Sequence, residues 1–412
     1  MSPGKTQRIQ GADSPHKYDY LLIVIIAALL ILGLMMVYSA TFALGYQLYG
    51  QPTYFFIRQL LWMGLGLMAM IITARVEYHT WRRWSVLIMA GALLLLGLVL
   101  TVGSDRFGGQ RWLLNGSIQP GELAKLAVIM YIADWLSSKG ERIRNVTYGL
   151  IPFAILLGFV TGLIMLQPDF STAVLIVVTA IAMFFIAGGD LWQMIASAVL
   201  GGTTFVLLVT RSDYRLARIS SFLNPVGDQL GGNYQMRQIL IALGSGGITG
   251  LGLGASRQKF GYIPASHTDG IFAILGEELG LVGCLLVIAL FALLAYRGFR
   301  VAMAAPDAFG TVLAAGITCS LIFQAIINIA VVTATAPVTG MPLPFISFGG
   351  SSLVVSMTAV GLLLAISRGT LPEEKEHPED QKELVSRAPH DFRRWDRGSR
   401  VSRPDRRRVV DS

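Results

Sequence analysis

The most constraining feature of the sequence is a series of long apolar blocks that recur between residues 20 and 368. A helix that crosses a bilayer needs about 20 predominantly apolar residues, and such blocks are rare in soluble domains. Because 53% of the residues are hydrophobic and only 14% are charged, we expect an all-α polytopic membrane protein. Ten blocks are candidate spans, centred near residues 32, 64, 93, 129, 157, 180, 200, 283, 320 and 357.

The blocks divide the chain into three regions. Residues 1–19 form a polar leader, residues 20–368 the transmembrane domain and residues 369–412 a polar tail. Because further spans follow the first block, we do not expect a cleaved signal peptide. The tail is nearly neutral and ends in a basic stretch, which favours a disordered, solvated segment over one that binds anionic lipid.

If both termini are cytoplasmic, the basic connections between spans also fall on the cytoplasmic side, as the positive-inside rule requires. Their cationic residues are Arg75, Arg82, Arg83, Lys139, Arg142, Arg144, Arg297 and Arg300. This orientation places the connection between the seventh and eighth spans, residues 211–268, outside the cell.

The connection at residues 211–268 is long, and long loops are usually functional or disordered. An apolar helical pattern from Tyr234 to Leu243 favours a folded cap with re-entrant or interfacial helices. Its positive charge indicates an anionic ligand, although long loops cross membranes largely regardless of charge. Its cationic residues are Arg211, Arg215, Arg218, Arg237, Arg257 and Lys259, and a second outer connection adds Arg106 and Arg111. The sequence has no basic surface of domain size, so its charge pattern does not indicate a nucleic-acid partner.

Two patterns argue against common cofactor sites. The glycine run at residues 244–254 lacks the Gly-Lys-Ser/Thr ending of a phosphate-binding loop, so we expect it to form turns and close helix contacts. Cys284 and Cys319 lie within apolar blocks and are expected to be packing residues. The His residues show no spacing typical of zinc ligands.

Ionisable residues inside apolar blocks are costly and are therefore candidate functional residues. Glu122 and Lys125 are spaced i, i+3 and share one helical face, where they form either a mutual ion pair or part of an active cavity. Asp269 stands at the start of the eighth block, where it either caps the helix together with Ser266 or acts in catalysis.

Two further stretches point to an irregular interior. Glu277 and Glu278 lie deeper in the eighth block, so at least one must face protein or water, and Glu278 is a candidate for a bond between helices. The stretch "PVTGMPLPFISFGGSS", residues 337–352, carries prolines and glycines that break a helix. Because irregular backbone at membrane depth needs protein or a water-filled cavity around it, we expect a kinked cavity wall there.

Seven ordered sequence blocks resemble the SEDS family, the bacterial cell-wall polymerases of shape, elongation, division and sporulation. They are "GQRWL" (109–113), "QPGELAKLA" (119–127), "QPDFST" (167–172), "GGNYQMRQ" (231–238), "GLGLGASRQK" (250–259), "HTD" with "EELG" (267–269 and 277–280) and "TGMPLPFISFGGSS" (339–352). Three of them resemble the division member FtsW more than the elongation member RodA. Ala265, Gly270 and Gly121 depart from the family pattern, which has Glu, Phe and Ser there, and these changes bear on substrate positioning and metal use.

The resemblance covers residues 20–368 and implies a peptidoglycan glycosyltransferase at the outer face of the bacterial plasma membrane. Its substrate would be lipid II, an undecaprenyl-pyrophosphate disaccharide-pentapeptide, and its product β-1,4 glycan strands. The implied partners are a class B penicillin-binding protein, which is a transpeptidase, and divisome proteins at the division septum. A RodA-like elongation polymerase is the alternative within the family.

For the site, the resemblance implies Asp269 as general base for the acceptor 4-hydroxyl. An α-linked donor that gives a β-linked product requires one inversion, and hence a base rather than a covalent carboxylate intermediate. We expect the leaving pyrophosphate to be held by Arg111, Arg215, Arg218 and Lys259. Further substrate contacts are expected at Gln235, His267, Thr268 and Ser351, and cavity positions at Glu122, Lys125, Glu278 and Asn328. No metal site is assigned; a divalent cation, Mg²⁺ or Mn²⁺, is a further candidate, with Asp269 as its ligand.

Two other functional classes are compatible with parts of the pattern. A lipid II flippase would suit the intramembrane charges and broken helices equally well. A scaffold that only docks partner proteins would use the polar residues for packing and capping. The ordered basic outer connection that carries Asp269 favours the polymerase, since a flippase does not need it.

Overall fold

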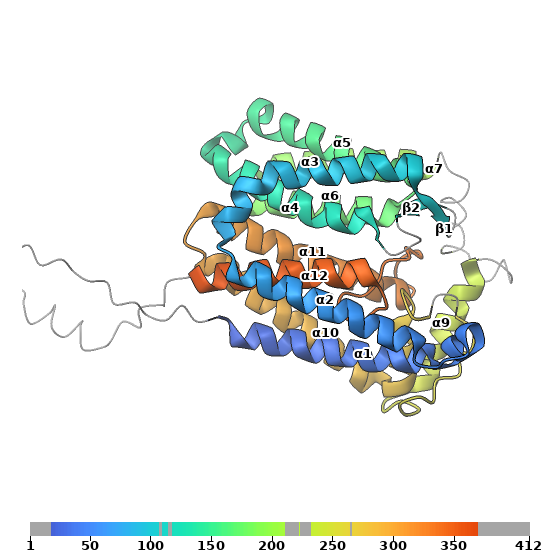
Figure 1. The fold of residues 1–412 in the computed structure, drawn as a ribbon. Coiled ribbons are helices and arrows are strands. Elements are labelled where there is room, and N and C mark those ends of the chain that lie inside the picture. The colour runs from blue at the N-terminus through green and yellow to red at the C-terminus, as the bar shows by residue number, and fades with distance from the viewer. Residues whose placement is uncertain are drawn as a thin grey trace, which may run out of the picture. The chain divides into compact units, whose positions relative to one another are not determined.

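The computed structural model describes residues 18–106, 109–113, 118–210, 222, 232–263 and 266–369. Contacts divide the chain into two units, Met1–Thr370 and Leu371–Ser412, and all described residues belong to the first. Long helices of this first unit run side by side, with a two-stranded ribbon and several irregular segments at one end (Figure 1).

The secondary structure is almost entirely helical. The α-helices are α1 (Tyr20–Tyr49), α2 (Tyr54–Arg75), α3 (Tyr78–Val102), α4 (Pro120–Lys139), α5 (Ile151–Leu166), α6 (Phe170–Ile186), α7 (Leu191–Thr210), α9 (Gly232–Gly246), α10 (Ile271–Ala304), α11 (Ala308–Val332) and α12 (Gly350–Gly369). Two short helical turns, η2 (Gly140–Arg144) and η3 (Val146–Leu150), join α4 to α5. Strands β1 (Ser104–Arg106) and β2 (Gly109–Trp112) pair antiparallel, with a register shift next to Ser104.

Four of the described helices begin at an aspartate whose side chain accepts a backbone hydrogen bond from the first turn, and at α7 this is Asp190, which accepts from the N–H of Trp192 at 3.4 Å. Asp19 accepts from the N–H of Leu22 at 3.1 Å, and Asp169 caps α6 in the same way. Asp307 accepts from the N–H of Gly310 at 3.3 Å at the start of α11. These carboxylates satisfy N–H groups that have no partner within the helix and interact favourably with the helix dipole.

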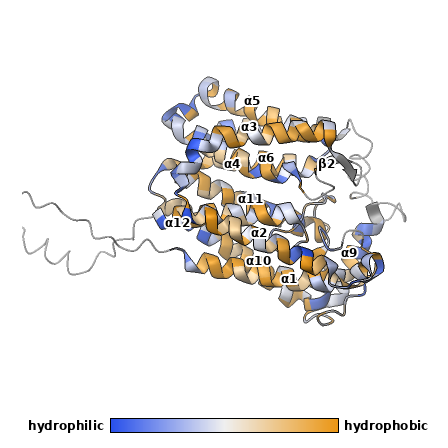
Figure 2. Ribbon diagram, viewed as in Figure 1, coloured by the Kyte–Doolittle hydropathy of each residue, from blue (hydrophilic) through white to orange (hydrophobic). Residues whose placement is uncertain are grey.

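Seven of the described helices are long and apolar enough to cross a membrane, by length and composition. They are α1, α2, α3, the continuous run of η3 and α5, α10, α11 and α12. The apolar colouring along these helices is visible in Figure 2. Helices α4, α6 and α7 occupy the three remaining positions at which the sequence predicted spans. The chain is therefore a multi-pass helical protein, and the count of ten spans stays a prediction.

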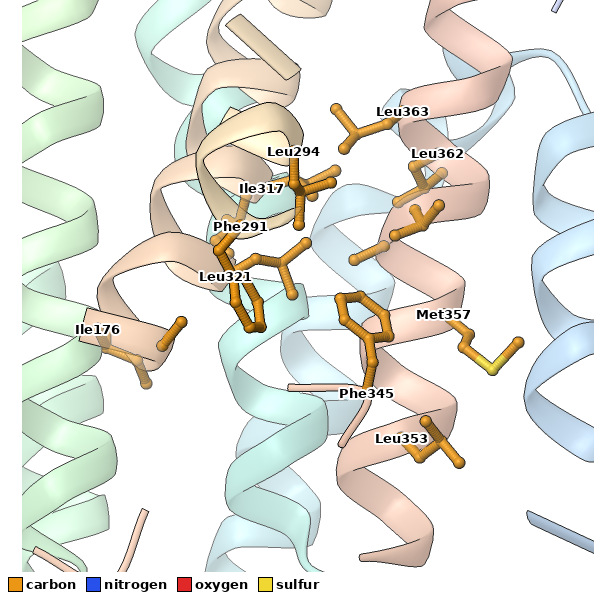
Figure 3. Close-up of a cluster of buried hydrophobic side chains, with 14 of the residues drawn as sticks. Ile176, Phe291, Leu294, Ile317, Leu321, Phe345, Leu353, Met357, Leu362 and Leu363 are labelled. Atoms are coloured by element: carbon orange, nitrogen blue, oxygen red, sulfur yellow. The ribbon is translucent and has the colours of Figure 1, made fainter. Parts of the chain in front are cut away.

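Helices α11 and α12 lie at the centre of the bundle. Helix α2 packs along α12, while α10, α4 and α6 pack against α11. The contacts between α10, α11 and α12 include Phe291 and Leu321, and Phe345 from the chain between α11 and α12 adds to this apolar cluster (Figure 3). Because lipid is as apolar as these side chains, close van der Waals packing rather than the hydrophobic effect holds such helices together.

The two ends of the bundle carry different structural features. At one end, called here the terminal end, α1 begins and α12 finishes: the backbone N–H of Asp19 donates to Ser367, and Arg297 of α10 forms an ion pair with Asp19 at 2.6 Å. The opposite end, called here the loop end, carries the β-ribbon, α9 and the irregular segments (Figure 1). The candidate site residues described below lie toward this loop end.

Helix α10 is interrupted at Gly280, whose φ of 67° and ψ of −164° are not helical. A turn at residues 247–254, called here the glycine-rich loop, fills the interruption. The N–H groups of Leu251 and Gly252 donate to the carbonyls of Glu277 and Glu278, both at 3.0 Å. In return, the N–H groups of the two residues after Gly280 donate to carbonyls of the loop. The loop thus supplies the backbone hydrogen bonds that the interrupted helix lacks.

Candidate active site

Asp269 lies just before α10, at the loop end of the bundle. The residue that caps α10 is Gly270, and the helix begins at Ile271. Asp269 therefore lies one residue before the cap, outside the first helical turn, and its catalytic role stays a prediction. Asp269 is partly buried, so the residue reaches the surface at this end of the bundle.

The surroundings of Asp269 hold its backbone and side chain in one position. The hydroxyl of Thr268 donates to Oδ1 of Asp269 at 2.9 Å. From α11, the side-chain amide of Asn328 donates to the backbone carbonyl of Asp269 at 3.0 Å and to that of Met341 at 2.7 Å. Gly340 adjoins the other carboxylate oxygen: a Cβ at this glycine would lie 3.9 Å from Oδ2. Asn328 therefore links Asp269 to the chain between α11 and α12.

That chain, residues 333–349, is called here the α11–α12 segment. The hydroxyl of Ser347 accepts from the N–H of Leu343 at 2.7 Å and donates to the carbonyl of Thr268 at 2.5 Å. The N–H of Phe348 donates to the carbonyl of His267 at 2.9 Å. The proline- and glycine-rich stretch thus folds against the His-Thr-Asp sequence and fixes its course. The irregular backbone expected for this stretch is present, and its role as a cavity wall stays a prediction.

His267 is enclosed by aromatic rings. Its ring lies 5.5 Å from Phe55 of α2 and 5.7 Å from Phe348, measured between centroids. Its Nδ1 atom is buried and has no hydrogen-bond partner. Burial lowers the pKa of His267 to about 4, because an apolar environment disfavours the charged form. The imidazole is therefore neutral at physiological pH and does not carry a positive charge toward a ligand.

A second carboxylate, Asp169, lies close to the α11–α12 segment. Besides capping α6, it accepts a hydrogen bond from the side-chain amide of Gln119 at 3.0 Å. Two residues later, the hydroxyl of Ser171 donates to the carbonyl of Thr339 at 2.6 Å. Asp169 is buried. The sequence analysis did not assign it a role, although the "QPDFST" block contained the signal.

Glu122 and Lys125 form a buried ion pair in α4, with 2.7 Å between Oε2 and Nζ. The Lys125 ammonium also donates to Oε1 of Gln324 at 2.8 Å, and the amide of Gln324 donates to the carbonyl of Pro342 at 2.8 Å. The pair is thus connected to the same α11–α12 segment that holds Asp269. A small cavity between α4, α11 and α12 is lined by both charged residues and Gln324. The mutual ion pair is therefore present, and a role of the pair in an active cavity stays a prediction.

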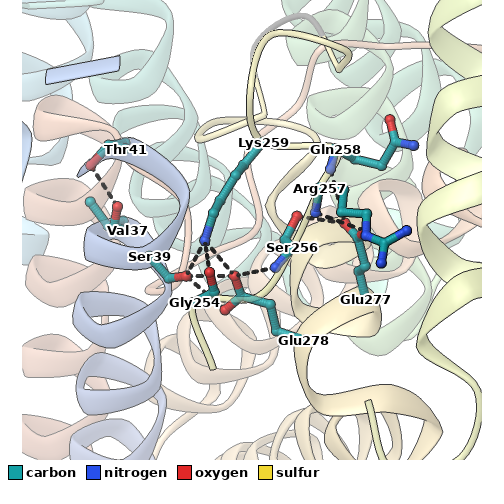
Figure 4. A network of polar contacts seen from close by, with 10 residues as sticks. All are labelled: Val37, Ser39, Thr41, Gly254, Ser256, Arg257, Gln258, Lys259, Glu277 and Glu278. Atoms are coloured by element: carbon teal, nitrogen blue, oxygen red, sulfur yellow. Dashed lines mark hydrogen bonds and ion pairs between the residues drawn. The ribbon is translucent and has the colours of Figure 1, made fainter. Parts of the chain in front are cut away.

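Lys259 and Glu278 form a second ion pair, with 3.1 Å between Nζ and Oε1, and neither side chain is exposed. The ammonium also donates to the carbonyl of Gly254 at 2.7 Å and lies 4.7 Å from the ring of Phe42. The hydroxyl of Ser39 in α1 donates to both oxygens of Glu278 (Figure 4). Glu278 therefore bonds across helices, as expected. The enclosure of Lys259 does not fit the expectation that it contacts a pyrophosphate.

Glu277 anchors the chain just after the glycine-rich loop. Its carboxylate accepts from the hydroxyl of Ser256 at 2.5 Å and from the N–H of Arg257 at 3.0 Å (Figure 4). A weaker bond joins it to the N–H of Gln258. These contacts explain why two adjacent glutamates stand in an apolar block: Glu278 is paired with a lysine, and Glu277 accepts several hydrogen bonds from uncharged donors.

The remaining residues expected to contact substrate are spread over the loop end. Arg111 lies in β2, half-buried, and its Nε has no partner. Gln235 lies half-buried in α9, and Ser351 is buried in the first turn of α12. Arg215 and Arg218 lie outside the described residues. Within the described part of the chain, no three His, Cys, Asp or Glu side chains converge as a metal site would require.

The bundle of apolar helices and the carboxylate held at its loop end define a multi-pass membrane protein with a candidate acid–base site at one membrane face. The sequence model of a family described as "Cell cycle protein", FtsW/RodA/SpoVE, matches residues 19–371. The chain belongs to this family.

Named relatives and solved structures agree with this assignment. The chain is 45% identical to stage V sporulation protein E of Bacillus subtilis, covering 85% of this chain and 97% of that protein. It is 41% identical to a probable peptidoglycan glycosyltransferase FtsW of Trichlorobacter lovleyi, covering 86% and 94%. A chain of a peptidoglycan synthase complex superimposes with a TM-score of 0.71 at 28% identity, covering 86% and 99%. The rod shape determining protein RodA of Thermus thermophilus gives 0.64 at 28% identity, covering 86% and 97%.

Proposed function

We propose that the chain is a peptidoglycan glycosyltransferase that polymerises lipid II into β-1,4 glycan strands. The reaction takes place at the outer face of the bacterial plasma membrane, and both termini are cytoplasmic. The observation that carries the proposal is the position of Asp269, which is partly exposed at the loop end and whose backbone is held by Asn328. Membership of the family and the names of the relatives support the same activity.

In the proposed mechanism, Asp269 removes the proton from the acceptor sugar 4-hydroxyl as this oxygen attacks the anomeric carbon of the donor strand. The bond between that carbon and the pyrophosphate oxygen breaks with inversion, and the pyrophosphate leaves with the electron pair. Asn328 and Thr268 hold Asp269 in place for this step. The uncharged state of His267 leaves the Asp269 carboxylate without a neighbouring imidazolium that would weaken it as a base.

Cationic side chains at the loop end offset the negative charge that gathers on the leaving pyrophosphate. Arg111 remains a candidate because its half-buried guanidinium has an unpartnered nitrogen. Arg215 and Arg218 remain candidates from the sequence alone. We leave Lys259 out of this group because Glu278 and Phe42 enclose its ammonium.

We further propose a class B penicillin-binding protein and divisome proteins as partners, and the division septum as the site of action. The structural likeness to a chain of a peptidoglycan synthase complex supports a transpeptidase partner. In this proposal ten helices cross the membrane, and residues 211–268 form the extracellular connection. A fluorescent fusion that spreads along the side wall instead of gathering at midcell would favour a RodA-like elongation role.

The activity is tested by comparing Asp269→Asn with the unaltered protein, each purified with its transpeptidase partner and incubated with lipid II. We expect the variant to lose at least about 100-fold in polymerisation rate, since a general base contributes roughly that much or more. Asp190→Asn is the matched control, because Asp190 is exposed and far along the chain from the site. Glycan strands formed by Asp269→Asn at the control rate would refute the assignment of the base.

The second candidate function is a lipid II flippase. The observation that favours it is the Glu122–Lys125 ion pair buried within the bundle beside a small cavity, since charges at membrane depth often mark a transport pathway. Vesicles that contain fluorescent lipid II separate the two functions. A flippase changes the accessibility of the label without making strands, whereas a polymerase makes strands from lipid II supplied on the outer side.

A further inference from the structure

Helix α10 changes its environment at the interruption. Every residue from Ile271 to Glu278 is buried, whereas the helix after Gly280 exposes a continuous apolar stripe. The stripe includes Leu281, Val282, Leu285 and Leu286, each about half exposed. In a multi-pass protein this stripe faces lipid, because large apolar side chains exposed along a spanning helix have no other solvent. The section before Gly280 is instead surrounded by protein.

The glycine-rich loop continues this lipid-facing stripe. Its carbonyls at Gly247 and Ile248 accept from the N–H groups of Leu281 and Val282, at 3.0 and 3.2 Å, so loop and stripe are joined through the backbone. The side chains of Ile248, Leu251 and Leu253 are exposed by 70%, 44% and 58%. Exposed apolar side chains gathered on a short loop favour contact with something apolar rather than with water.

Two contacts between α1 and α10 place the loop at a defined membrane depth. Asp19 and Arg297 pair at the terminal end, and Ser39 bonds Glu278 near the loop end. The separation is 20 positions along α1 and 19 along α10. At 1.5 Å per residue this corresponds to about 28–30 Å, which is the thickness of a hydrocarbon core of about 30 Å. The loop, bonded next to Glu278, therefore lies at the far boundary of the hydrocarbon.

The residues that follow the loop suit the adjoining headgroup layer. Phe260 and Tyr262 are each about half exposed, and aromatic residues are enriched at membrane interfaces. Arg257 is exposed and can reach lipid phosphates. In the sequence, the apolar tip is thus followed by a cation and two aromatic side chains, which are residue types suited to the headgroup layer.

Both glycine geometry and hydrogen bonding allow this placement. Gly250 has a φ of 82°, and a Cβ there would lie within van der Waals overlap of the Glu278 carbonyl. Irregular backbone is tolerated at membrane depth only where its polar groups are satisfied. The loop meets this condition by exchanging four backbone hydrogen bonds with the interrupted α10.

We infer that the glycine-rich loop is embedded in the leaflet at the loop end, where Ile248, Leu251 and Leu253 contact lipid acyl chains. The loop is bonded to α10, and Asp269 lies immediately before this helix. The lipid contact therefore fixes the depth in the membrane of the α10 section that follows Asp269. The lipid contact itself does not depend on the proposed enzymatic activity.

The test uses the full chain, with Cys284→Ala and Cys319→Ala, reconstituted in phosphatidylcholine and phosphatidylglycerol vesicles. A nitroxide label is attached at Leu253→Cys or Leu251→Cys, and its collisions with oxygen, which concentrates in lipid, and with a water-soluble nickel chelate are measured by electron paramagnetic resonance. Leu285→Cys is the lipid-facing control and Glu141→Cys, at an exposed position in η2, is the water-facing control.

We expect labels at Leu251→Cys and Leu253→Cys to collide with oxygen as the Leu285→Cys label does, and to be shielded from the nickel chelate. Nickel collisions at the level of Glu141→Cys would overturn the inference, because the loop would then lie in water. Shielding from both reagents would also overturn it, since protein rather than lipid would then cover the loop. Misfolding is detected independently by size-exclusion chromatography of each labelled variant before reconstitution, since a misfolded chain would elute as aggregate.

Discussion

At the scale of single residues, the Lys259–Glu278 pair places two opposite charges in the interior of the protein. Both side chains are fully buried, and each is satisfied by several partners. Taking two charges out of water is expensive, and the cost is offset only when geometry and further hydrogen bonds are good. Removing one member of the pair is therefore expected to cost more free energy than the intact pair contributes to the stability of the protein.

We predict that Lys259→Met destabilises the protein by about 3–5 kcal/mol, because it leaves Glu278 and Glu277 as adjacent buried carboxylates without a cation. Glu278→Gln should have a smaller effect, since Lys259 keeps the Gly254 carbonyl and the Phe42 ring. The double variant should recover part of the loss. Thermal unfolding in detergent measures all three, and equal losses for the two single variants would contradict this order.

His267 provides a second prediction at the same scale. Its pKa falls from 6.5 to about 4 on folding, so the unfolded chain takes up the proton at a higher pH than the folded chain does. The contribution of neutral His267 to stability is therefore fully present above about pH 6.5. It is lost as the pH falls toward 4, and the free energy of unfolding decreases by at most about 3 kcal/mol. In His267→Phe, which keeps an aromatic ring at this position but has no group that titrates, the melting temperature should fall less over this range. Parallel pH profiles of the two proteins would contradict the prediction.

At the scale of elements, the interruption of α10 depends on two backbones that touch. Gly250 and Gly280 both have positive φ, and a Cβ at either would overlap backbone atoms of the other segment. An interrupted helix that spans a membrane must find new partners for its N–H and C=O groups, and here the loop provides them. The section after Asp269 therefore depends on a loop that precedes it in the sequence.

We predict that Gly250→Ala lowers the yield of folded protein and the melting temperature, because alanine fits neither the positive φ nor the space beside the Glu278 carbonyl. Gly244→Ala is the matched control: it lies in α9 with nothing near the added Cβ, so it should be neutral or stabilise by about 0.5–1 kcal/mol. Fluorescence-detected size-exclusion chromatography after heating compares the two. A Gly250→Ala variant as stable as Gly244→Ala would show that the close contact is not required.

At the scale of the whole molecule, the bundle has one end fastened by the Asp19–Arg297 pair and another that carries the candidate site. The α11–α12 segment joins Asp269 on one side to Lys125 on the other through Asn328 and Gln324. A disturbance at the buried Glu122–Lys125 pair can therefore reach the candidate base through a short series of hydrogen bonds.

The orientation of the bundle gives a prediction for the complete molecule. Gln51, between α1 and α2, and Glu141, in η2, are both exposed and lie at opposite ends. With cytoplasmic termini, an impermeant maleimide added to intact spheroplasts should label Gln51→Cys and should label Glu141→Cys only after permeabilisation. Cys284→Ala and Cys319→Ala remove the background thiols. The reverse pattern would place Asp269 in the cytoplasm and exclude an extracellular polymerase.

The sequence by itself determined the helices and the position of the candidate base. Long apolar blocks must become helices in a bilayer because every backbone polar group needs an internal partner, and structure places a helix at each predicted block. The family resemblance located Asp269, although residue chemistry left helix capping and catalysis open.

Only the tertiary structure decided which charges are available to a ligand. Lys259 and the other basic residues of its connection look alike in sequence, yet Lys259 is enclosed by Glu278, Ser39 and Phe42 from other segments. The same holds for the glycine-rich loop, whose partner is the interruption of α10. Burial and pairing arise from contacts between segments distant in the chain, and local sequence patterns carry no information about which distant group will neutralise a charge.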